Sequence, residues 1–152
     1  MQRSDFEIMA PAGSREALAA ALQAGADSVY FGIGALNMRA HSAGGFTIDD
    51  LNEIAALCRE HGAKSYLTVN TVIYDGDLAA MREIVSAAKA AGVSAVIASD
   101  VAVMQCCREL GVEVHLSTQL NIANVEALRF YAQFADVVVL ARELTLRQVA
   151  DI

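Results

Sequence analysis

One pattern repeats along this chain: an amphipathic segment, usually ended by glycine, is followed by a short run of apolar and β-branched residues. The phrases that carry it are QAGADSVYFG, EHGAKSYLTV, AAGVSAVIAS, ELGVEVHLST and AQFADVVVLA. Glycine is the expected left-handed stop after a helix, and a short apolar run after such a stop is typical of a buried strand. The repeat therefore predicts successive strand–helix units.

The repeat predicts six strands, each followed by a helix. We expect strands at residues 7–10, 28–33, 65–69, 95–98 and 137–141, and one more that opens the stretch Glu113–Asn124. Helices are expected at residues 15–24, 47–61, 78–91, 101–110, 125–133 and from 146 onward. Capping residues mark their starts: Ser14, Asp77, Asp100, Asn124 and the capping-box pairs Thr47/Asp50 and Thr145/Gln148.

Strands that alternate with helices, without a hairpin signal, predict an α/β fold with a parallel sheet and right-handed crossovers. Two architectures fit: a (β/α)8 barrel and an open doubly wound sheet. Strands recur about every 26 residues, so eight units need roughly 210 residues, near the lower end of the usual barrel size. We therefore interpret residues 1–152 as a single domain that holds the first six units of a truncated barrel from a longer protein. An uncovered last strand predicts that this segment self-associates.

Composition refines this picture. Hydrophobic residues make up 55% of the chain, which buried parallel strands explain because both their faces are covered. No apolar run reaches the roughly 18–20 residues of a membrane span, and no apolar leader is found at the start, so we expect a cytoplasmic protein without membrane contact. The net charge of −7 argues against a broad phosphate-binding surface. The three cysteines lack metal-ligand spacing and are predicted to lie in the core.

Candidate chemistry lies at the carboxyl ends of the strands, where barrels carry their active sites. On one strand Tyr66, Thr68 and Asn70 share a face, and in the Glu113–Asn124 stretch Glu113, His115, Ser117 and Gln119 do the same. The residues that we expect to line a ligand pocket are Arg39, Asn70, Asp100, His115, Ser117, Gln119, Asn121, Arg142 and Glu143. The alternative is a hydrated barrel mouth with helix caps.

Most of these residues have two interpretations. His115 fits a general base or a hydrogen-bonded core histidine. Asp100 fits a ligand or a helix cap. Arg142 can hold a carboxylate or phosphate by two hydrogen bonds, or it can pair with Glu143 or a nearby loop. Arg39 lies in a glycine-rich loop suited to a lid, or it is an ordinary exposed arginine. No nucleophile elbow, zinc-protease motif or P-loop is found, so no catalytic residue or metal ligand is assigned.

Several phrases, taken together and in order, resemble a known family. They are APAGSREAL, GADSVYFG, NMRA, TVNT, IASD, HLSTQLNIAN and VVLAREL, and they resemble the collagenase-like peptidase family of unknown catalytic type. The resemblance implies a barrel domain in a longer bacterial protein labelled a peptidase. Other members of this family support hydroxylation of nucleobases in transfer or ribosomal RNA, or of ubiquinone without oxygen. The resemblance assigns no catalytic residue to this chain.

The resemblance also bears on cofactors and partners. Some relatives hold an iron–sulfur cluster through spaced cysteines that follow the barrel, so we expect no cofactor in this chain and a cluster only through residues outside it. The expected partners are the remainder of the polypeptide and an RNA or small-molecule substrate. Three hypotheses stay open: a peptidase domain, an RNA- or quinone-modifying domain, and a binding or assembly module without activity of its own.

Overall fold

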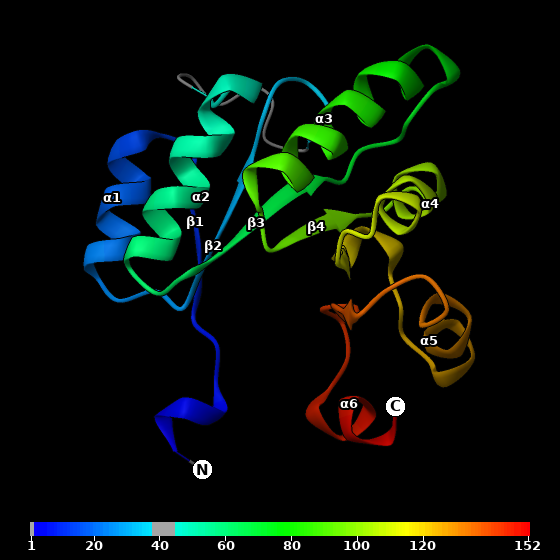
Figure 1. Cartoon of the computed structure of the whole chain (residues 1–152). Coiled ribbons are helices and arrows are strands. Elements are labelled where there is room, and N and C mark those ends of the chain that lie inside the picture. Colours follow the sequence, from blue (N-terminus) through cyan, green and yellow to red (C-terminus); the bar gives the residue numbers. More distant parts are fainter. Residues whose placement is uncertain (1, 38–44) are drawn as a thin grey trace.

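The computed structural model describes residues 2–37 and 45–152, which form one parallel sheet flanked by helices (Figure 1). The strands are β1 (Met9–Pro11), β2 (Ser28–Gly32), β3 (Lys64–Val69), β4 (Ala95–Ala98), β5 (Val114–Leu116) and β6 (Val137–Val138). Their order in the sheet follows their order in the chain, and each neighbouring pair is parallel. The predicted α/β class and unit order are therefore confirmed.

A helix follows each strand. The helices are α1 (Arg15–Gln23), α2 (Leu51–Glu60), α3 (Leu78–Ala91), α4 (Val101–Leu110), α5 (Val125–Tyr131) and α6 (Leu146–Asp151). The predicted glycine stops are found at Gly92 and Gly111, whose φ angles of 75° and 66° lie in the left-handed region. None of the helices in the described residues is long and apolar enough to cross a membrane.

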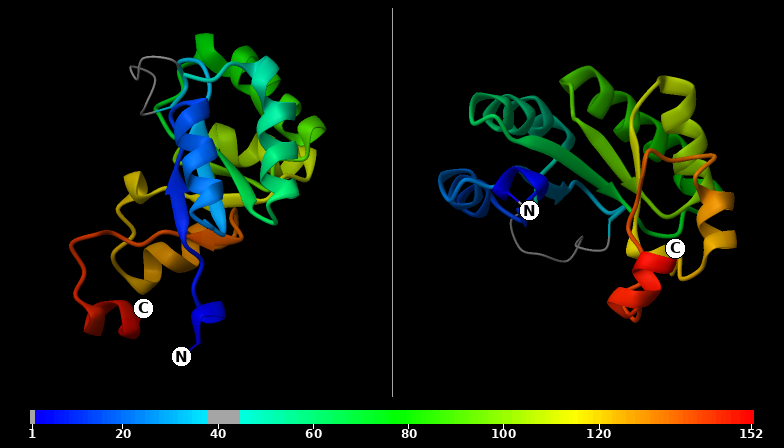
Figure 2. Two further views of the ribbon diagram at one scale, coloured as in Figure 1. Left: turned by 90° about the vertical axis from the view of Figure 1, so that its left-hand side faces the viewer. Right: turned by 90° about the horizontal axis from the view of Figure 1, so that it is seen from below.

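The sheet curls into part of a barrel, and the helices lie around its outside (Figure 2). Side chains from both edge strands, Met9 at one edge and Val139 just beyond β6 at the other, line the same inner cavity, which a flat sheet would not allow. The alternate side chains of the strands point outward against the helices. Phe31, Leu67 and Leu116, for example, are fully buried in the core between the sheet and the helices. The predicted barrel geometry, truncated, is confirmed.

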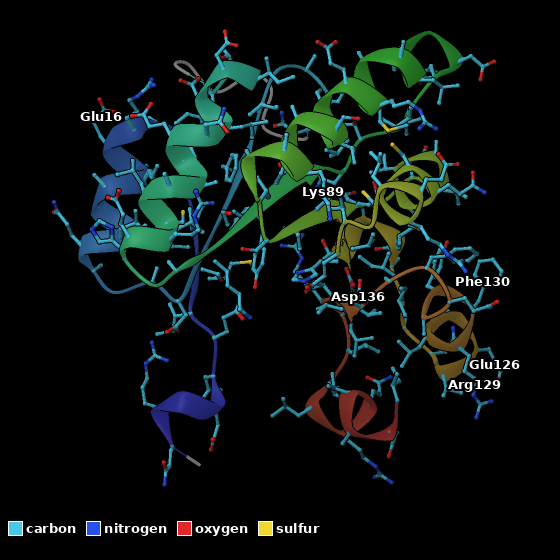
Figure 3. All side chains as sticks on the ribbon, viewed as in Figure 1. Glu16, Lys89, Glu126, Arg129, Phe130 and Asp136 are labelled. Atoms are coloured by element: carbon cyan, nitrogen blue, oxygen red, sulfur yellow. The ribbon has the colours of Figure 1, made fainter. Side chains whose placement is uncertain are left out.

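Polar contacts lie at the surface of the helices, one between the ends of α3 and α4 and one within α5. The Lys89 side chain, labelled in Figure 3, donates from Nζ to the carbonyl oxygen of Gly111 at 2.6 Å and so ties the end of α3 to the end of α4. On α5, Glu126 and Arg129 form an exposed ion pair at 2.8 Å, and Phe130 beside them is also exposed. Both contacts are exposed.

Four predictions about local structure need correction. The fifth strand ends at Leu116, and a 3-10 turn, Thr118–Leu120, follows it, so the strand alternation cannot be extended to Gln119. Asp77 does not cap α3: its carboxylate accepts from the backbone N–H of Tyr74 at 3.1 Å and closes the preceding turn instead. The helix predicted to reach residue 133 ends at Tyr131. The last strand is shorter than expected because only its first two residues form regular pairs with β5.

Candidate active-site pocket

A cavity lies on the inner face of the sheet at the carboxyl ends of its strands, and we call it the mouth cavity. It has a volume of about 410 Å³. Its lining residues are Met9, Tyr30, Thr68, Asn70, Ile97, Ser117, Thr118, Gln119, Val139 and Arg142. The volume falls in the range of 300–1,000 Å³ that small-molecule sites occupy, and its position is the one that barrels use for chemistry.

Ser117 lies at the centre of the polar side of the mouth cavity. It follows β5 directly, and its backbone N–H donates to the Ala98 carbonyl oxygen at 2.8 Å, which fixes the residue against β4. The Ser117 hydroxyl oxygen accepts from the Asn70 side-chain amide at 3.4 Å and from the backbone N–H of Gln119 at 3.3 Å. Asn70, Ser117 and Gln119 therefore form one connected polar group, although they come from two different strand ends.

Arg142 brings the positive charge of the mouth cavity. After β6 the chain still runs beside β5 and the turn that follows β5. The Val139 N–H donates to the Leu116 carbonyl oxygen at 3.1 Å, and the Ala141 N–H donates to the Ile122 carbonyl oxygen at 2.9 Å. Ala141 is buried, so the backbone next to Arg142 is fixed at both ends of this short segment. The exposed Arg142 side chain extends from this point into the lining of the cavity.

A smaller cavity of about 220 Å³, which we call the rim cavity, adjoins the mouth cavity through Asn70 and Gln119. Asp100 lines it and also caps α4, because one carboxylate oxygen accepts from the Ala102 N–H at 2.8 Å. The second oxygen accepts from the Ile73 N–H at 3.2 Å. The predicted cap is thus confirmed, and Asp100 additionally fastens the loop after β3 to the start of α4.

The other end of the inner face holds a third cavity, the base cavity, of about 280 Å³. His115 lies here, 7% exposed, with its Nε2 2.8 Å from Glu113 Oε1 and its ring centroid 4.6 Å from that of Tyr66. Of the two interpretations of His115, this geometry fits the hydrogen-bonded core histidine. Because residues two apart on a strand are separated by roughly 6.6 Å, His115 and Ser117 occupy different levels of the barrel, and each has other partners.

Tyr66, which lines the base cavity, is hydrogen-bonded to Glu7 near the first strand. Its hydroxyl donates to Glu7 Oε1 at 2.7 Å, and Lys64 Nζ lies 3.0 Å from the other Glu7 oxygen. Burial and the hydrogen bond to Glu7 raise the pKa of Tyr66 to about 12. Partial burial opposes ionisation of Glu7, but hydrogen bonds led by that from Tyr66 outweigh it and lower the Glu7 pKa. These contacts tie the segment just before β1 to β3 at the base of the barrel.

The structure thus separates the predicted site residues. It brings Asn70, Ser117, Gln119 and Arg142 together in the mouth cavity, with Asp100 next to them in the rim cavity. Asn121 and Glu143 are exposed and line neither of these two cavities. Asn121 has a φ of 50° and closes the turn after β5, a conformation that asparagine tolerates. Arg39 lies outside the described residues.

Sequence reasoning missed some lining residues. Strand alternation places Thr118 on the opposite face from Ser117, but the 3-10 turn brings both to the mouth cavity. Tyr30 and Ile97 also line it, from strands whose fully apolar or mixed sequence gave no polar alternation to follow. The register of β2 and β4 with β3 would have found them, because Thr68 is paired with Ile97 and its neighbour Tyr66 with Tyr30.

The cysteines do not fit an iron–sulfur cluster. Cys58 on α2 and Cys106 and Cys107 on α4 are all buried in the core, as predicted. Burial raises the pKa of each thiol, to about 12 for Cys107, whereas a cluster is held by thiolates. Within residues 2–37 and 45–152, no group of three or more histidine, cysteine, aspartate or glutamate residues could hold a metal ion.

Comparison with known proteins agrees with this geometry. The model of the family described as Peptidase family U32 matches residues 13–152. A collagenase from Porphyromonas gingivalis is 67% identical over the whole chain, which covers 37% of that protein. The tRNA hydroxylation protein P1 of Bacillus subtilis is 34% identical over 95% of this chain and 35% of its own length. The chain thus spans little more than a third of these relatives.

A solved structure supports the fold independently of sequence. The structure of the U32 peptidase Mk0906 superimposes with a TM-score of 0.72 at 12% identity, covering 89% of this chain and 58% of that one. At this identity the likeness concerns the fold alone, and it is the barrel-like arrangement described above. The family match extends over nearly all of the sequence and includes every described lining residue of the mouth cavity except Met9. It therefore carries more weight than the likeness in fold. The chain belongs to peptidase family U32.

Proposed function

We propose that this chain forms part of the catalytic barrel of a U32-family enzyme and supplies one wall of its substrate pocket. The observation that carries the proposal is the mouth cavity, where Asn70, Ser117 and Arg142 meet from three strand ends. A barrel active site draws on several strands, so we expect no activity from residues 1–152 alone. The remainder of the polypeptide is then the essential partner, and we place the protein in the cytoplasm.

Two reactions compete for the full-length protein. Peptide hydrolysis is supported by the 67% identical relative named collagenase. Hydroxylation of an RNA nucleobase is supported by the relative named as a tRNA hydroxylation protein. The arrangement of Ser117 and His115 does not favour a serine peptidase, because the serine is hydrogen-bonded to Asn70 and Gln119 while the histidine contacts Glu113. An iron–sulfur cluster would need cysteines outside this chain.

The experiment compares the full-length gene product with residues 1–152. Purified full-length protein is incubated with gelatin and a collagen-derived peptide, and transfer- and ribosomal-RNA nucleosides are compared between cells with and without the gene. Peptide cleavage that survives in Ser117→Ala and His115→Ala variants would assign a peptidase whose nucleophile is neither residue. A hydroxylated nucleoside that disappears with the gene would assign the RNA reaction. If the full-length protein cleaves no peptide and no nucleoside changes with the gene, the enzymatic proposal is refuted.

Anaerobic purification tests the cluster as a separate matter. A visible absorption band and bound iron in the full-length protein, retained when Cys58, Cys106 and Cys107 are each replaced by alanine, would place the cluster ligands outside this chain. Loss of the band in any of these variants would contradict the assignment of the three cysteines to the core, provided that the variant keeps its circular dichroism spectrum. Iron-free protein that is active would remove the cluster from the proposal.

A further inference from the structure

The described lining of the mouth cavity has a positive side chain and no negative one. Among the described residues that line it, Arg142 alone is charged, and none is an aspartate or a glutamate. The chain as a whole has 18 acidic and 11 basic residues. Arg3, Arg15 and Arg82, for comparison, each form an ion pair at 2.6–2.8 Å with a carboxylate. No ion pair joins Arg142 to any residue that the structure describes.

The Ser117 hydroxyl presents a second donor to the same space. A hydroxyl has one hydrogen and two lone pairs. Both lone pairs of Ser117 accept, one from the Asn70 amide and one from the Gln119 N–H, so its hydrogen remains to be donated. No acceptor for that hydrogen is found among the described residues, and Ser117 is only 5% exposed. The hydroxyl lines the mouth cavity, so an acceptor oxygen of a ligand bound there can take this hydrogen.

The shape of the cavity limits the ligand further. The space that the described residues enclose, about 410 Å³, is larger than an inorganic oxyanion requires. Met9, Ile97 and Val139 line the deeper side and are shared with the base cavity, so the inner part of a ligand would contact apolar side chains. The polar groups lie at the strand ends. A ligand that fits both sides has an oxyanion head and an apolar body.

We propose that the mouth cavity binds a small organic oxyanion, a carboxylate or a phosphate ester, through a charge-assisted contact from Arg142 and a hydrogen bond from the Ser117 hydroxyl. The inference rests on the proposed role of this cavity as a wall of the active site, and it adds the chemical class of the molecule bound there. Arginine suits both head groups because its planar fork gives two parallel hydrogen bonds to either. Asn70 and the Gln119 backbone are positioning groups, because they hold the Ser117 oxygen.

The test measures binding to the full-length gene product by calorimetry. The probes are benzoate, phenyl phosphate and inorganic phosphate, and the variants are Arg142→Gln, Arg142→Lys and Ser117→Ala. Arg147→Gln is the matched control, because Arg147 is an exposed arginine on α6 that lines none of the three cavities. We expect one saturable site for at least one organic probe. Loss of the charged contact in Arg142→Gln should weaken it on the order of 10- to 100-fold.

The other variants sharpen this expectation. Arg142→Lys should recover part of the affinity, since it keeps the charge but not the two-point contact. Ser117→Ala should weaken binding several-fold, and Arg147→Gln should leave it unchanged. Preference for benzoate or for phenyl phosphate identifies the head group. Equal affinity in Arg142→Gln and wild type, binding of inorganic phosphate alone, or no saturable binding of either organic probe at millimolar concentration would overturn the proposal.

The two proposals fail in different ways. If wild-type protein is enzymatically active but neither organic probe binds or inhibits it, the oxyanion site is wrong and the enzymatic proposal stands. If the probes bind with the expected dependence on Arg142 while no cleavage or nucleoside change is found, the oxyanion site stands and the enzymatic proposal is wrong.

Discussion

Replacement of Asp100 gives a sharp test of how the pocket is built. The Asp100 carboxylate accepts from the Ala102 N–H at 2.8 Å and from the Ile73 N–H at 3.2 Å. Loss of a helix N-cap costs about 1 kcal/mol, and loss of one further hydrogen bond costs about the same. Asp100→Ala should therefore weaken the local structure by about 2 kcal/mol. Asp100→Asn keeps an acceptor for α4 but presents its amide hydrogens to the Ile73 N–H, so it should affect the loop alone.

Amide hydrogen exchange in the full-length protein reads out these contacts segment by segment. In Asp100→Ala, exchange should accelerate on the order of fivefold in residues 71–75 and again in the first turn of α4, since each segment loses one contact of about 1 kcal/mol and about 1.4 kcal/mol corresponds to a factor of ten. In Asp100→Asn the acceleration should be confined to residues 71–75. Asp75→Ala is the control, because Asp75 lies in the same loop, is exposed and does not hold Ile73.

Exchange within about threefold of wild type in both segments of Asp100→Ala would refute the reasoning, because this factor corresponds to roughly 0.6 kcal/mol. Weakened binding of a mouth-cavity probe in Asp100→Asn, without any change in exchange, would instead make Asp100 a ligand-contacting residue. The two interpretations of this aspartate thus give different observable patterns.

Three further predictions follow from named contacts. Leu116→Ala, which empties a fully buried position of β5, should destabilise the protein by about 2–5 kcal/mol in urea unfolding, and a loss below about 1 kcal/mol would contradict the core assignment. The three buried thiols should resist a thiol reagent at pH 8 until the protein unfolds, because burial raises their pKa values; rapid native-state labelling would speak against this. Asp27 accepts from the Ile8 N–H and from Arg3, which lowers its pKa, so its stabilising effect is present above its ordinary pKa and disappears as the pH falls through the lowered value. Asp27→Asn should flatten the acid side of the stability profile, and an unchanged acid transition would show that Asp27 does not contribute.

Local signals in the sequence determined the units of this fold. Glycine stops before apolar runs located four of the six strands, β2 to β5, and the capping residues Ser14, Asp100 and Asn124 marked helix starts as expected. Such signals act over a few residues, through left-handed backbone freedom and side-chain acceptors for orphan N–H groups, and can therefore be read without a tertiary structure. The alternation on β3 also assigned Thr68 and Asn70 to the inner face correctly.

Tertiary structure alone decided which polar residues share a cavity. Ser117 and His115 have the same strand parity, but the levels of the barrel separate them, since their distance along β5 exceeds a hydrogen bond. Arg142 and Asn70 are distant in sequence and meet because the sheet curls. Asp77 and Asp100 both precede helices, yet only Asp100 caps one, because the 3-10 turn before α3 claims the Asp77 carboxylate. Partnership between side chains depends on curvature and on competing acceptors, which the linear pattern does not contain.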